Sequence, residues 1–211
     1  MSERINEIYR RLLDHFGPQG WWPGETPFEV MVGAVLTQNT NWGNVEKAIT
    51  NLKNAGFLSL EALADLDRNV LAELIRPSGY YNLKAKRLKN LLAAITENEG
   101  DLDDYFACDL ETLREKLLQV KGIGPETADS IILYAAEKPS FVVDAYTVRI
   151  LRRHDLVWEE ADYHEIRELF MDSLPEDTAL YNEYHALIVK TAKEFCLKNN
   201  PRCEECPLKG I

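Results

Sequence analysis

Two features of this sequence combine residue types and spacing that suit chemistry on a sugar-phosphate backbone: a Gly-x-Gly turn and a downstream aspartate. The turn is Gly122-Ile123-Gly124, which follows an apolar helical pattern and precedes Pro125. Glycine adopts positive φ without steric cost, and proline suits the first position of a helix. Such a turn would direct several backbone N–H groups and the positive end of a helix dipole at one point, which suits a phosphate. Asp144 adds a carboxylate at the start of a further helix, so the two features indicate backbone binding with acid chemistry beside it.

These residues resemble a known motif. Lys121, Gly122, Gly124 and Asp144 are similar to the helix-hairpin-helix and Gly/Pro-Asp motif of the base excision DNA glycosylases of the endonuclease III superfamily. The resemblance extends over residues 27–206. It implies that the partner is double-stranded DNA with a damaged base, and that the hairpin residues contact this DNA.

Asp144 is the predicted catalytic residue. It follows two valines, so we expect it to end a buried apolar segment and to be the N-cap of a helix that starts at Ala145. There it would accept N–H bonds from Tyr146 or Thr147, which favour the ionised carboxylate. A carboxylate fixed beneath a deoxyribose can stabilise the positive charge that develops at C1′ as the base leaves, and it can orient the attacking water. The alternative is a purely structural N-cap.

Glu126 distinguishes this chain within the superfamily. Members that also cut the strand carry, two positions after the second glycine of the hairpin, a lysine that forms a Schiff base. Glu126 occupies that position and cannot form one, and Lys121 cannot easily substitute because it precedes the glycines. The sequence therefore predicts a monofunctional glycosylase without AP-lyase activity. Glu126 also suits the first turn of a helix as a partner of the dipole.

Tryptophans near the N-terminus are candidates for binding an extrahelical base. Trp21, Trp22 and Pro23 lie in a loop rich in glycine and proline, and Trp42 follows further along. A flipped base stacks on aromatic faces, and a cationic alkylated purine also gains cation–π attraction. We expect Trp42 and one of Trp21 or Trp22 to line the base pocket. The alternative is that the tryptophans fill a seam between two lobes.

Two charged positions complete the predicted pocket. Glu126 would favour a cationic base, and the family resemblance implies that Lys193 or Lys190 on the last helix reaches the cleft. The alternative for both lysines is a solvated position near a helix C-terminus.

Three stretches, at residues 21–23, 28–30 and 36–40, resemble the endonuclease III-related 3-methyladenine DNA glycosylases. By this resemblance Gln38 enters the space left by the flipped base, although a polar residue after an apolar helix is otherwise an ordinary surface residue. Tyr80 occupies the wedge loop of the family, where a bulky side chain would separate base pairs. The alternative for a tyrosine there is packing against the following helix.

Three cysteines near the C-terminus form a predicted metal site. Cys196, Cys203 and Cys206 are clustered in a way that indicates metal ligation in a cytosolic protein. The resemblance implies a 4Fe-4S cluster held by four thiolates. The fourth cysteine of that pattern would be at position 212, so either the chain is cut short of this ligand or the site is incomplete. Zinc held by three cysteines and a histidine, with His185 nearby in sequence, is the alternative.

Composition and charge restrict the location of the protein and the way in which it can bind nucleic acid. No apolar run approaches the roughly 18–20 residues that span a bilayer, and the N-terminus lacks the apolar core of a signal peptide. We therefore expect a cytoplasmic monomer that does not associate with membranes. The net charge of −11 argues against a protein that coats nucleic acid electrostatically. DNA binding would need a local basic patch, and residues 84–89 are the densest basic stretch.

The elements that must position these residues are helices. Apolar residues recur at spacings of three and four along most of the chain, including 5–16, 83–95, 163–174 and 178–196. Ser59 and Asp109 precede two such patterns as N-caps. No convincing strand pattern occurs, and the fold class is therefore all-α. Seams rich in proline and glycine, together with the family resemblance, divide the chain into two lobes with a DNA-binding cleft between them. One lobe comprises six helices over 27–138, with the helix-hairpin-helix at about 113–136, and the other comprises 1–26 plus 139–211.

The favoured function is excision of an alkylated purine, 3-methyladenine above all, to leave an abasic site. A mismatch thymine, uracil or adenine glycosylase of the same fold is a second hypothesis. A non-catalytic protein that binds damaged DNA is a third, and a strand-cutting lyase is a fourth.

Overall fold

The computed structural model describes residues 1–21, 24–98 and 100–211, and these residues form helices and loops without a strand. The predicted all-α fold class is confirmed. None of the helices in the described residues has the length and apolarity needed to cross a membrane. The chain divides into two compact units, one of Met1–Trp21 with Pro139–Ile211 and one of Trp22–Lys138.

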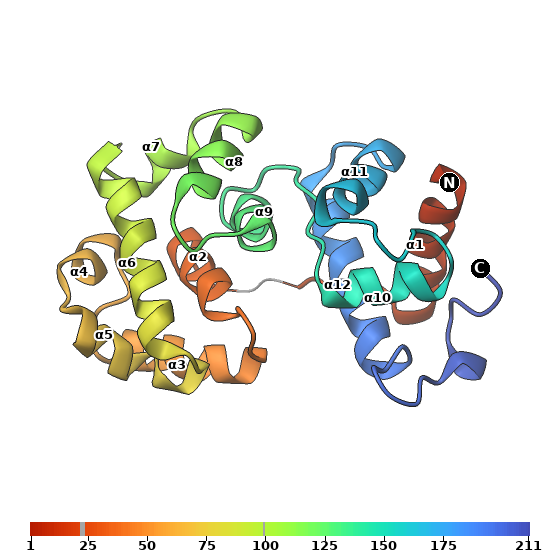
Figure 1. The fold of residues 1–211 in the computed structure, drawn as a ribbon, viewed down its shortest axis with the longest axis horizontal. Helices are drawn as coiled ribbons and strands as arrows, with labels where there is room; N and C mark the ends of the chain where they lie inside the picture. The colour runs from red at the N-terminus through yellow and green to blue at the C-terminus, as the bar shows by residue number, and fades with distance from the viewer. Residues whose placement is uncertain (22–23, 99) are drawn as a thin grey trace. The chain divides into compact units, whose positions relative to one another are not determined.

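The first unit joins the N-terminal helix to the C-terminal part of the chain (Figure 1). Its elements are α1 (Ser2–Phe16), α10 (Ala145–Arg153), α11 (Tyr163–Ser173), α12 (Thr178–Glu194) and the 3-10 helix η2 (Cys203–Glu205). α12 packs on α10 and on α1, and α1 also packs on α11. Aromatic residues fill the core: the ring of Phe141 stacks on that of Phe170 at 3.9 Å, and the Tyr184 hydroxyl donates to the carbonyl of Ile5.

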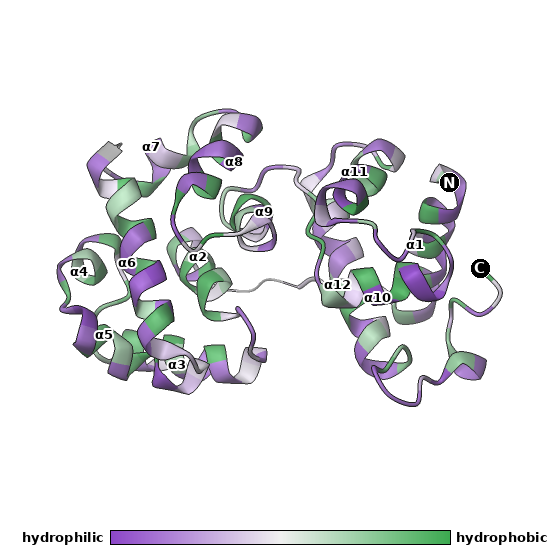
Figure 2. Ribbon diagram, in the orientation of Figure 1, coloured by the Kyte–Doolittle hydropathy of each residue, from purple (hydrophilic) through white to green (hydrophobic). Residues whose placement is uncertain are grey.

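The second unit is built around α2, in which almost every residue is buried. Its elements are α2 (Pro27–Leu36), α3 (Trp42–Asn54), α4 (Leu60–Asp65), α5 (Arg68–Leu74), η1 (Arg76–Ser78), α6 (Tyr81–Asn98), α7 (Leu102–Phe106), α8 (Leu110–Gln119) and α9 (Pro125–Tyr134). α2 packs on α3, α6 and α9, and α8 packs on α9. Hydrophobic and hydrophilic stretches alternate along α6, as expected for a helix with one buried face (Figure 2).

Polar side chains start most of these helices. Ser59 accepts the N–H of Ala62 at the start of α4, and Asp109 accepts the N–H of Thr112 at the start of α8, so both predicted N-caps are present. A side-chain cap satisfies N–H groups that have no partner within the helix. α9 is different, because its N-cap is Gly124, which has no side chain to accept a hydrogen bond.

Candidate active site and nucleic-acid interface

Asp144 lies in the first unit at the start of α10, directly after the buried residues Val142 and Val143. Its Oδ1 accepts the backbone N–H of Thr147 at 2.8 Å and the hydroxyl of Thr147 at 2.9 Å. One carboxylate oxygen is therefore occupied by the helix that it caps. The Asp-x-x-Thr spacing produces this geometry locally, because the N–H and the hydroxyl of the third helical residue both face the N-cap.

The second oxygen of Asp144 faces a histidine from another helix. Oδ2 lies 3.5 Å from Nε2 of His185 on α12, and the two side chains are only 14% and 6% exposed. Burial acts to raise the pKa of Asp144, but His185 and the two hydrogen bonds from Thr147 outweigh it, so the pKa lies below the usual value. The structure therefore holds a buried, ionised carboxylate with a fixed orientation.

Trp21 lies beside the same histidine. The indole and imidazole centroids are 6.0 Å apart, with the ring planes inclined by 33°. The loop before Trp21 is bound to α12, because the N–H groups of Gln19 and Gly20 donate to the two carboxylate oxygens of Glu183 at 2.6 and 3.2 Å. In the first unit Asp144, His185 and Trp21 are thus neighbours, although they are far apart in sequence.

The hairpin lies in the second unit between α8 and α9. Gly122 has φ of +104°, and a Cβ atom there would lie 2.5 Å from Cγ of Arg87, so both its conformation and its packing require glycine. Gly124 precedes Pro125 in an extended conformation and leaves the first turn of α9 without a side-chain cap. The side chain of Lys121 is exposed, while its carbonyl accepts a bond of 2.8 Å from Asn90.

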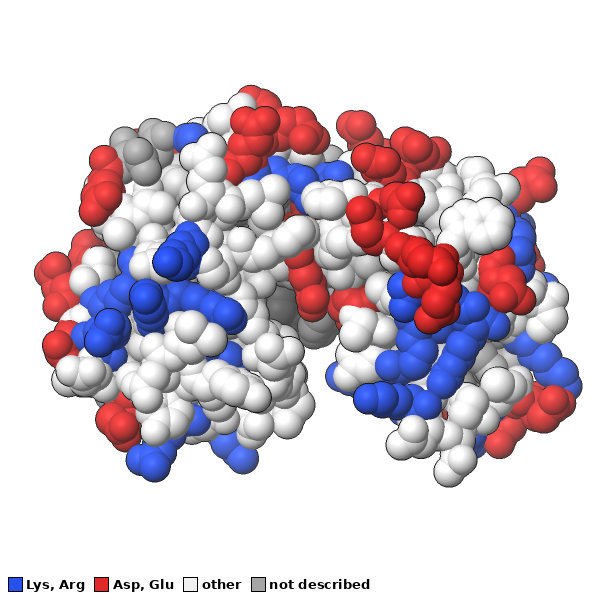
Figure 3. All heavy atoms as spheres, in the orientation of Figure 1, with Lys and Arg blue, Asp and Glu red and all other residues white. Residues whose placement is uncertain are grey.

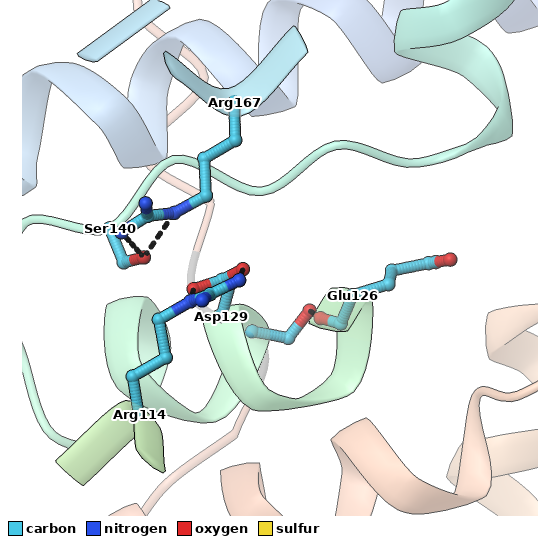
Figure 4. Close-up of polar contacts among 6 residues, drawn as sticks. Arg114, Glu126, Asp129, Ser140 and Arg167 are labelled. Carbon is cyan, nitrogen blue, oxygen red and sulfur yellow. Dashed lines mark hydrogen bonds and ion pairs between the residues drawn. The ribbon is translucent and has the colours of Figure 1, made fainter. Parts of the chain in front are cut away.

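A buried ion pair holds the two hairpin helices together. Arg114 of α8 donates through Nε and Nη2 to the two oxygens of Asp129 of α9, at 2.9 and 3.2 Å. Asp129 is fully buried. Figure 4 shows this pair, and it shows Glu126 of α9 extending away from it. Glu126 is exposed in the first turn of α9, as expected for an acid at the positive end of the dipole.

Gln38 is bound to the hairpin through its amide. Its Nε2 donates to the hydroxyl of Thr127 at 2.9 Å and approaches the carbonyl of Gly122 at 3.3 Å. Its Oε1 accepts from Nη1 of Arg87. Gln38 is half-buried, so the structure shows it as part of a polar network rather than as an isolated surface residue.

Tyr80, the predicted wedge residue, is 70% exposed. It precedes α6 with φ of +46°, directly after Gly79 with φ of +69°. Positive φ is costly for a bulky residue and persists only where the surroundings enforce it.

Trp42 starts α3 and rests on α2. A Cβ atom at Gly33 would lie 3.4 Å from Cη2 of the indole, so this glycine leaves room for the ring. Trp42 is half-buried as a result. On α12, Lys193 is exposed, whereas Nζ of Lys190 lies 5.1 Å above the ring of Phe16. Trp22 and Pro23 lie outside the described residues.

The comparisons with known proteins agree on one family. Residues 32–176 match the HhH-GPD superfamily of base excision DNA repair proteins. The chain belongs to this superfamily. The predicted membership is thereby confirmed, and the protein is a base excision repair DNA glycosylase by family.

Individual relatives are similar over nearly the whole chain. A putative DNA repair glycosylase of Methanocaldococcus jannaschii is 52% identical, over 98% of this chain and 94% of the relative. Endonuclease III of Thermotoga maritima is 32% identical, over 98% of this chain and 91% of the relative. The protein in the crystal structure of an H. pylori 3-methyladenine DNA glycosylase bound to 1,N6-ethenoadenine has 34% sequence identity to this chain. The two structures match with a TM-score of 0.78, and the match covers 91% of this chain and 96% of that chain.

The basic stretch on α6 is less exposed than the DNA-facing patch that was expected from the sequence. Basic side chains gather over α6 in Figure 3. However, Nζ of Lys84 is buried and donates to the carbonyls of Leu36 and Ser78, and Nζ of Lys89 donates to those of Leu63 and Ala64. Of these three lysines Lys86 alone is exposed, because α6 turns the other two toward carbonyl groups at the ends of neighbouring elements.

The three C-terminal cysteines differ in environment. Cys196 is buried, Cys203 is exposed, and Cys206 is half-buried. Burial raises the pKa of the Cys206 thiol, and the other two thiols act in the same direction. Within the described residues, no three His, Cys, Asp or Glu side chains are grouped closely enough to hold a metal ion. The predicted cluster therefore stays a prediction.

Sequence reasoning missed several residues that surround the predicted site. His185 drew notice only as a residue near the cysteines, whereas the structure places it against Asp144. Glu183 gave no local signal, and Lys84 was grouped with the basic stretch at residues 84–89. Thr147 was recoverable, because a serine or threonine three residues after an N-cap aspartate is well placed to donate to it.

Proposed function

We propose that this protein is a monofunctional DNA glycosylase that hydrolyses the N-glycosidic bond of a flipped alkylated purine, with 3-methyladenine favoured, and leaves an abasic site. The observation that carries the proposal is Asp144, a buried carboxylate whose pKa lies below the usual value and whose two oxygens are oriented by Thr147 and His185. Such a group remains negatively charged throughout the neutral range.

The role of Asp144 is electrostatic. As the bond between C1′ and the base breaks, the sugar gains oxocarbenium character, and a fixed anion close to it lowers the energy of the transition state. Thr147 binds Oδ1, so Oδ2, which lies beside Nε2 of His185, is the oxygen that would face the sugar or orient a water molecule. The hydrogen bonds from Thr147 keep the carboxylate in place, so it need not reorganise during the reaction.

Recognition of the base would use aromatic faces. Trp21 beside His185 and Trp42 on Gly33 are the described rings of the predicted pocket, with Trp22, Pro23, Glu126 and Lys193 as its further members. Cation–π attraction and the charge of Glu126 would favour a purine that carries a positive charge after alkylation. The similarity to a 3-methyladenine glycosylase, at 34% identity, supports this substrate class.

The lyase step is expected to be absent. A lyase of this superfamily needs an amine nucleophile at the start of the second hairpin helix, and Glu126 supplies a carboxylate there. Hydrolysis by water would then be the only route to base release.

Binding of damaged double-stranded DNA would rest on the second unit. The uncapped start of α9 at Gly124, the positive φ of Gly122 and the exposed Lys121 suit a phosphate. Gln38 and Tyr80 would fill the space of the flipped base and separate the adjacent base pairs.

The deciding experiment is release of free bases from methylated duplex DNA, with 3-methyladenine and 7-methylguanine resolved by chromatography. We expect release of 3-methyladenine by the native protein and none by Asp144→Asn. Borohydride treatment is expected to trap no covalent adduct with DNA. Release of thymine or uracil from a mismatch, with methylated purines untouched, would replace the proposed substrate. No release of any base would support a damage-binding protein instead.

We also propose that Cys196, Cys203 and Cys206 contribute ligands to a 4Fe-4S cluster, on the strength of the sequence pattern and the relatives named endonuclease III. The test is the iron and sulfide content of protein purified without oxygen, together with its visible absorption. Zinc in place of iron would overturn the assignment.

A further inference from the structure

One face of α6 carries three polar side chains at intervals of three residues: Lys84, Arg87 and Asn90. Residues spaced in this way lie along one side of a helix. Each of the three binds a segment on which the proposed function depends.

Lys84 is the buried member of this polar stripe, with 1% exposure. Its Nζ donates to the carbonyl of Leu36 at 2.8 Å and to the carbonyl of Ser78 at 2.6 Å. Its backbone N–H donates to the carbonyl of Tyr80 at 3.0 Å. One residue therefore holds the end of α2, the end of η1 and the start of α6 together.

Burying an ammonium group without a carboxylate partner is expensive, so such a group persists only where its hydrogen bonds matter. The acceptors recorded for Lys84 are main-chain carbonyls, which are neutral. Burial, and then the charge of Arg87, lowers the pKa of Lys84 to about 8. Leu36 ends α2, where carbonyl groups lack partners within the helix and carry the negative end of the dipole.

The two carbonyls that Lys84 binds come directly before strained backbone. After Leu36 the chain passes through Gln38 to Asn39, which has φ of +54°. After Ser78 it passes through Gly79 to Tyr80, which has φ of +46°. The residues that carry the two DNA-probing side chains thus lie within two positions of a carbonyl bound to the same ammonium group.

The other two members of the stripe bind the hairpin. Arg87 donates to Oε1 of Gln38, and its aliphatic part packs on Gly122, where no Cβ atom would fit. Asn90 donates to the carbonyl of Lys121 at 2.8 Å. The stripe therefore connects three loops, at residues 37–40, 79–80 and 121–124, through one rigid helix.

We infer that Lys84 is a positioning residue for recognition of damaged DNA: its buried ammonium holds the Gln38 loop and the Tyr80 loop at a fixed separation, and the polar stripe of α6 aligns both with the hairpin. This inference rests on the proposed function. Preformed loops bind distorted DNA more tightly because less conformational entropy is lost on binding. The role of Lys84 is separate from bond cleavage at Asp144.

The chain supplies a matched control. Lys89, on the same helix, donates through Nζ to the carbonyls of Leu63 and Ala64 at 2.8 and 2.7 Å, near the end of α4. Lys84→Met and Lys89→Met each remove an ammonium bound to two main-chain carbonyls, but only Lys84 adjoins Gln38 and Tyr80. If Lys84→Met does not fold, Lys84→Gln, which retains a donor, takes its place.

The measurement is the ratio of affinities for a duplex with a tetrahydrofuran abasic-site analogue and for the undamaged duplex, corrected for folded protein. We expect Lys84→Met to lower this ratio roughly tenfold, equivalent to about 1.4 kcal/mol. Lys89→Met should leave the ratio unchanged even if it lowers the melting temperature. 2-Aminopurine opposite the lesion should become less fluorescent with Lys84→Met than with the native protein, because the probing side chains no longer displace it.

Equal ratios for the two variants would overturn the inference and assign Lys84 a purely structural role. A native protein that neither prefers the abasic duplex nor releases a base would instead contradict the proposed function. The two failures are therefore distinguishable.

Discussion

The starts of α9 and α10 are both helix N-termini, but the chain treats them in opposite ways. α10 begins at Asp144, whose carboxylate accepts the N–H of Thr147 in the first turn of its own helix. α9 begins at Gly124, which provides no side-chain acceptor. The first arrangement uses the helix to hold an internal anion, and the second leaves N–H groups and a dipole for an external one.

This difference shows that a helix N-terminus can serve two functions. At α10 the N–H and hydroxyl of Thr147 help to keep a carboxylate ionised and oriented. At α9 the glycine places neither a side chain nor a charge at the N-cap, so a phosphate could approach the backbone. Substitutions at four positions test this contrast.

The largest effect is expected from Asp144→Asn. Asparagine caps helices about as well as aspartate, so α10 should remain intact. The negative charge is lost, and base release should fall by roughly a thousandfold, the scale of removing one preorganised electrostatic group. Single-turnover release of methylated purine measures this, and a melting temperature close to that of the native protein serves as the control. Residual release within tenfold of the native rate would show that the carboxylate is only a cap.

Gly124→Asp should convert the start of α9 into a copy of the start of α10. A Cβ atom at Gly124 meets nothing within 4 Å, and the backbone is already extended, so the substitution is sterically tolerated. The new cap should stabilise the protein by only a few tenths of a kcal/mol, roughly, whereas the negative charge should weaken DNA binding by roughly ten- to a hundredfold.

Gly124→Ser separates the effect of the new cap from the effect of the negative charge, because serine caps the helix without adding charge. Binding by fluorescence anisotropy and unfolding by denaturant are the measurements. Unchanged affinity in Gly124→Asp would exclude this helix start as a phosphate site.

Thr147→Val removes the hydroxyl donor to Asp144 but keeps the backbone N–H and nearly the same volume. The pKa of Asp144 lies below its usual value of 3.8, so the ionised form stabilises the fold above about pH 4 and this contribution is lost as the pH falls through the lower, native pKa. Loss of one hydrogen bond raises the native pKa. Both the acid limb of the kcat/KM profile and acid unfolding should therefore shift to higher pH, and an unshifted profile would contradict the assigned hydrogen bond.

Lys121→Ala should give the smallest effect. The side chain is exposed beside the hairpin, and a single phosphate contact of this kind contributes modestly. Affinity should fall severalfold, and the slope of log affinity against log salt should decrease by about one. The control is Lys198→Ala, an exposed lysine in the other unit. An identical salt slope in both variants would remove Lys121 from the interface.

Local patterns in the sequence predicted the helix starts well. Ser59, Asp109 and Asp144 each cap the helix that follows, because N-cap chemistry depends on residues two or three positions away. The glycines of the hairpin and Pro125 behave likewise. The all-α fold follows from apolar periodicity, which is also local.

The remaining features of the site could not be predicted from the sequence, because they depend on long-range contacts. Lys84 was grouped with a basic surface stretch, yet it precedes Leu88 by four residues and Leu91 by seven and therefore shares their buried face. Its acceptors, the carbonyls of Leu36 and Ser78, become available only when α2 and η1 pack beside α6. His185 likewise gave no sign of its contact with Asp144, because the two lie on different helices.

The sequence by itself determined the family motif, the helix starts and the residue at position 126, since each depends on residue identity at fixed, short spacing. Only the tertiary structure decided which neighbours orient Asp144, which lysines of α6 face inward, and how Gln38 is bound to the hairpin. The physical reason is that hydrogen bonds and burial depend on distances in space, and these are set when the helices pack. The Gly-x-Gly turn illustrates both contributions. Its glycines were evident from the sequence, but the packing of the Arg87 side chain that excludes a Cβ atom at Gly122 was seen only in the tertiary structure.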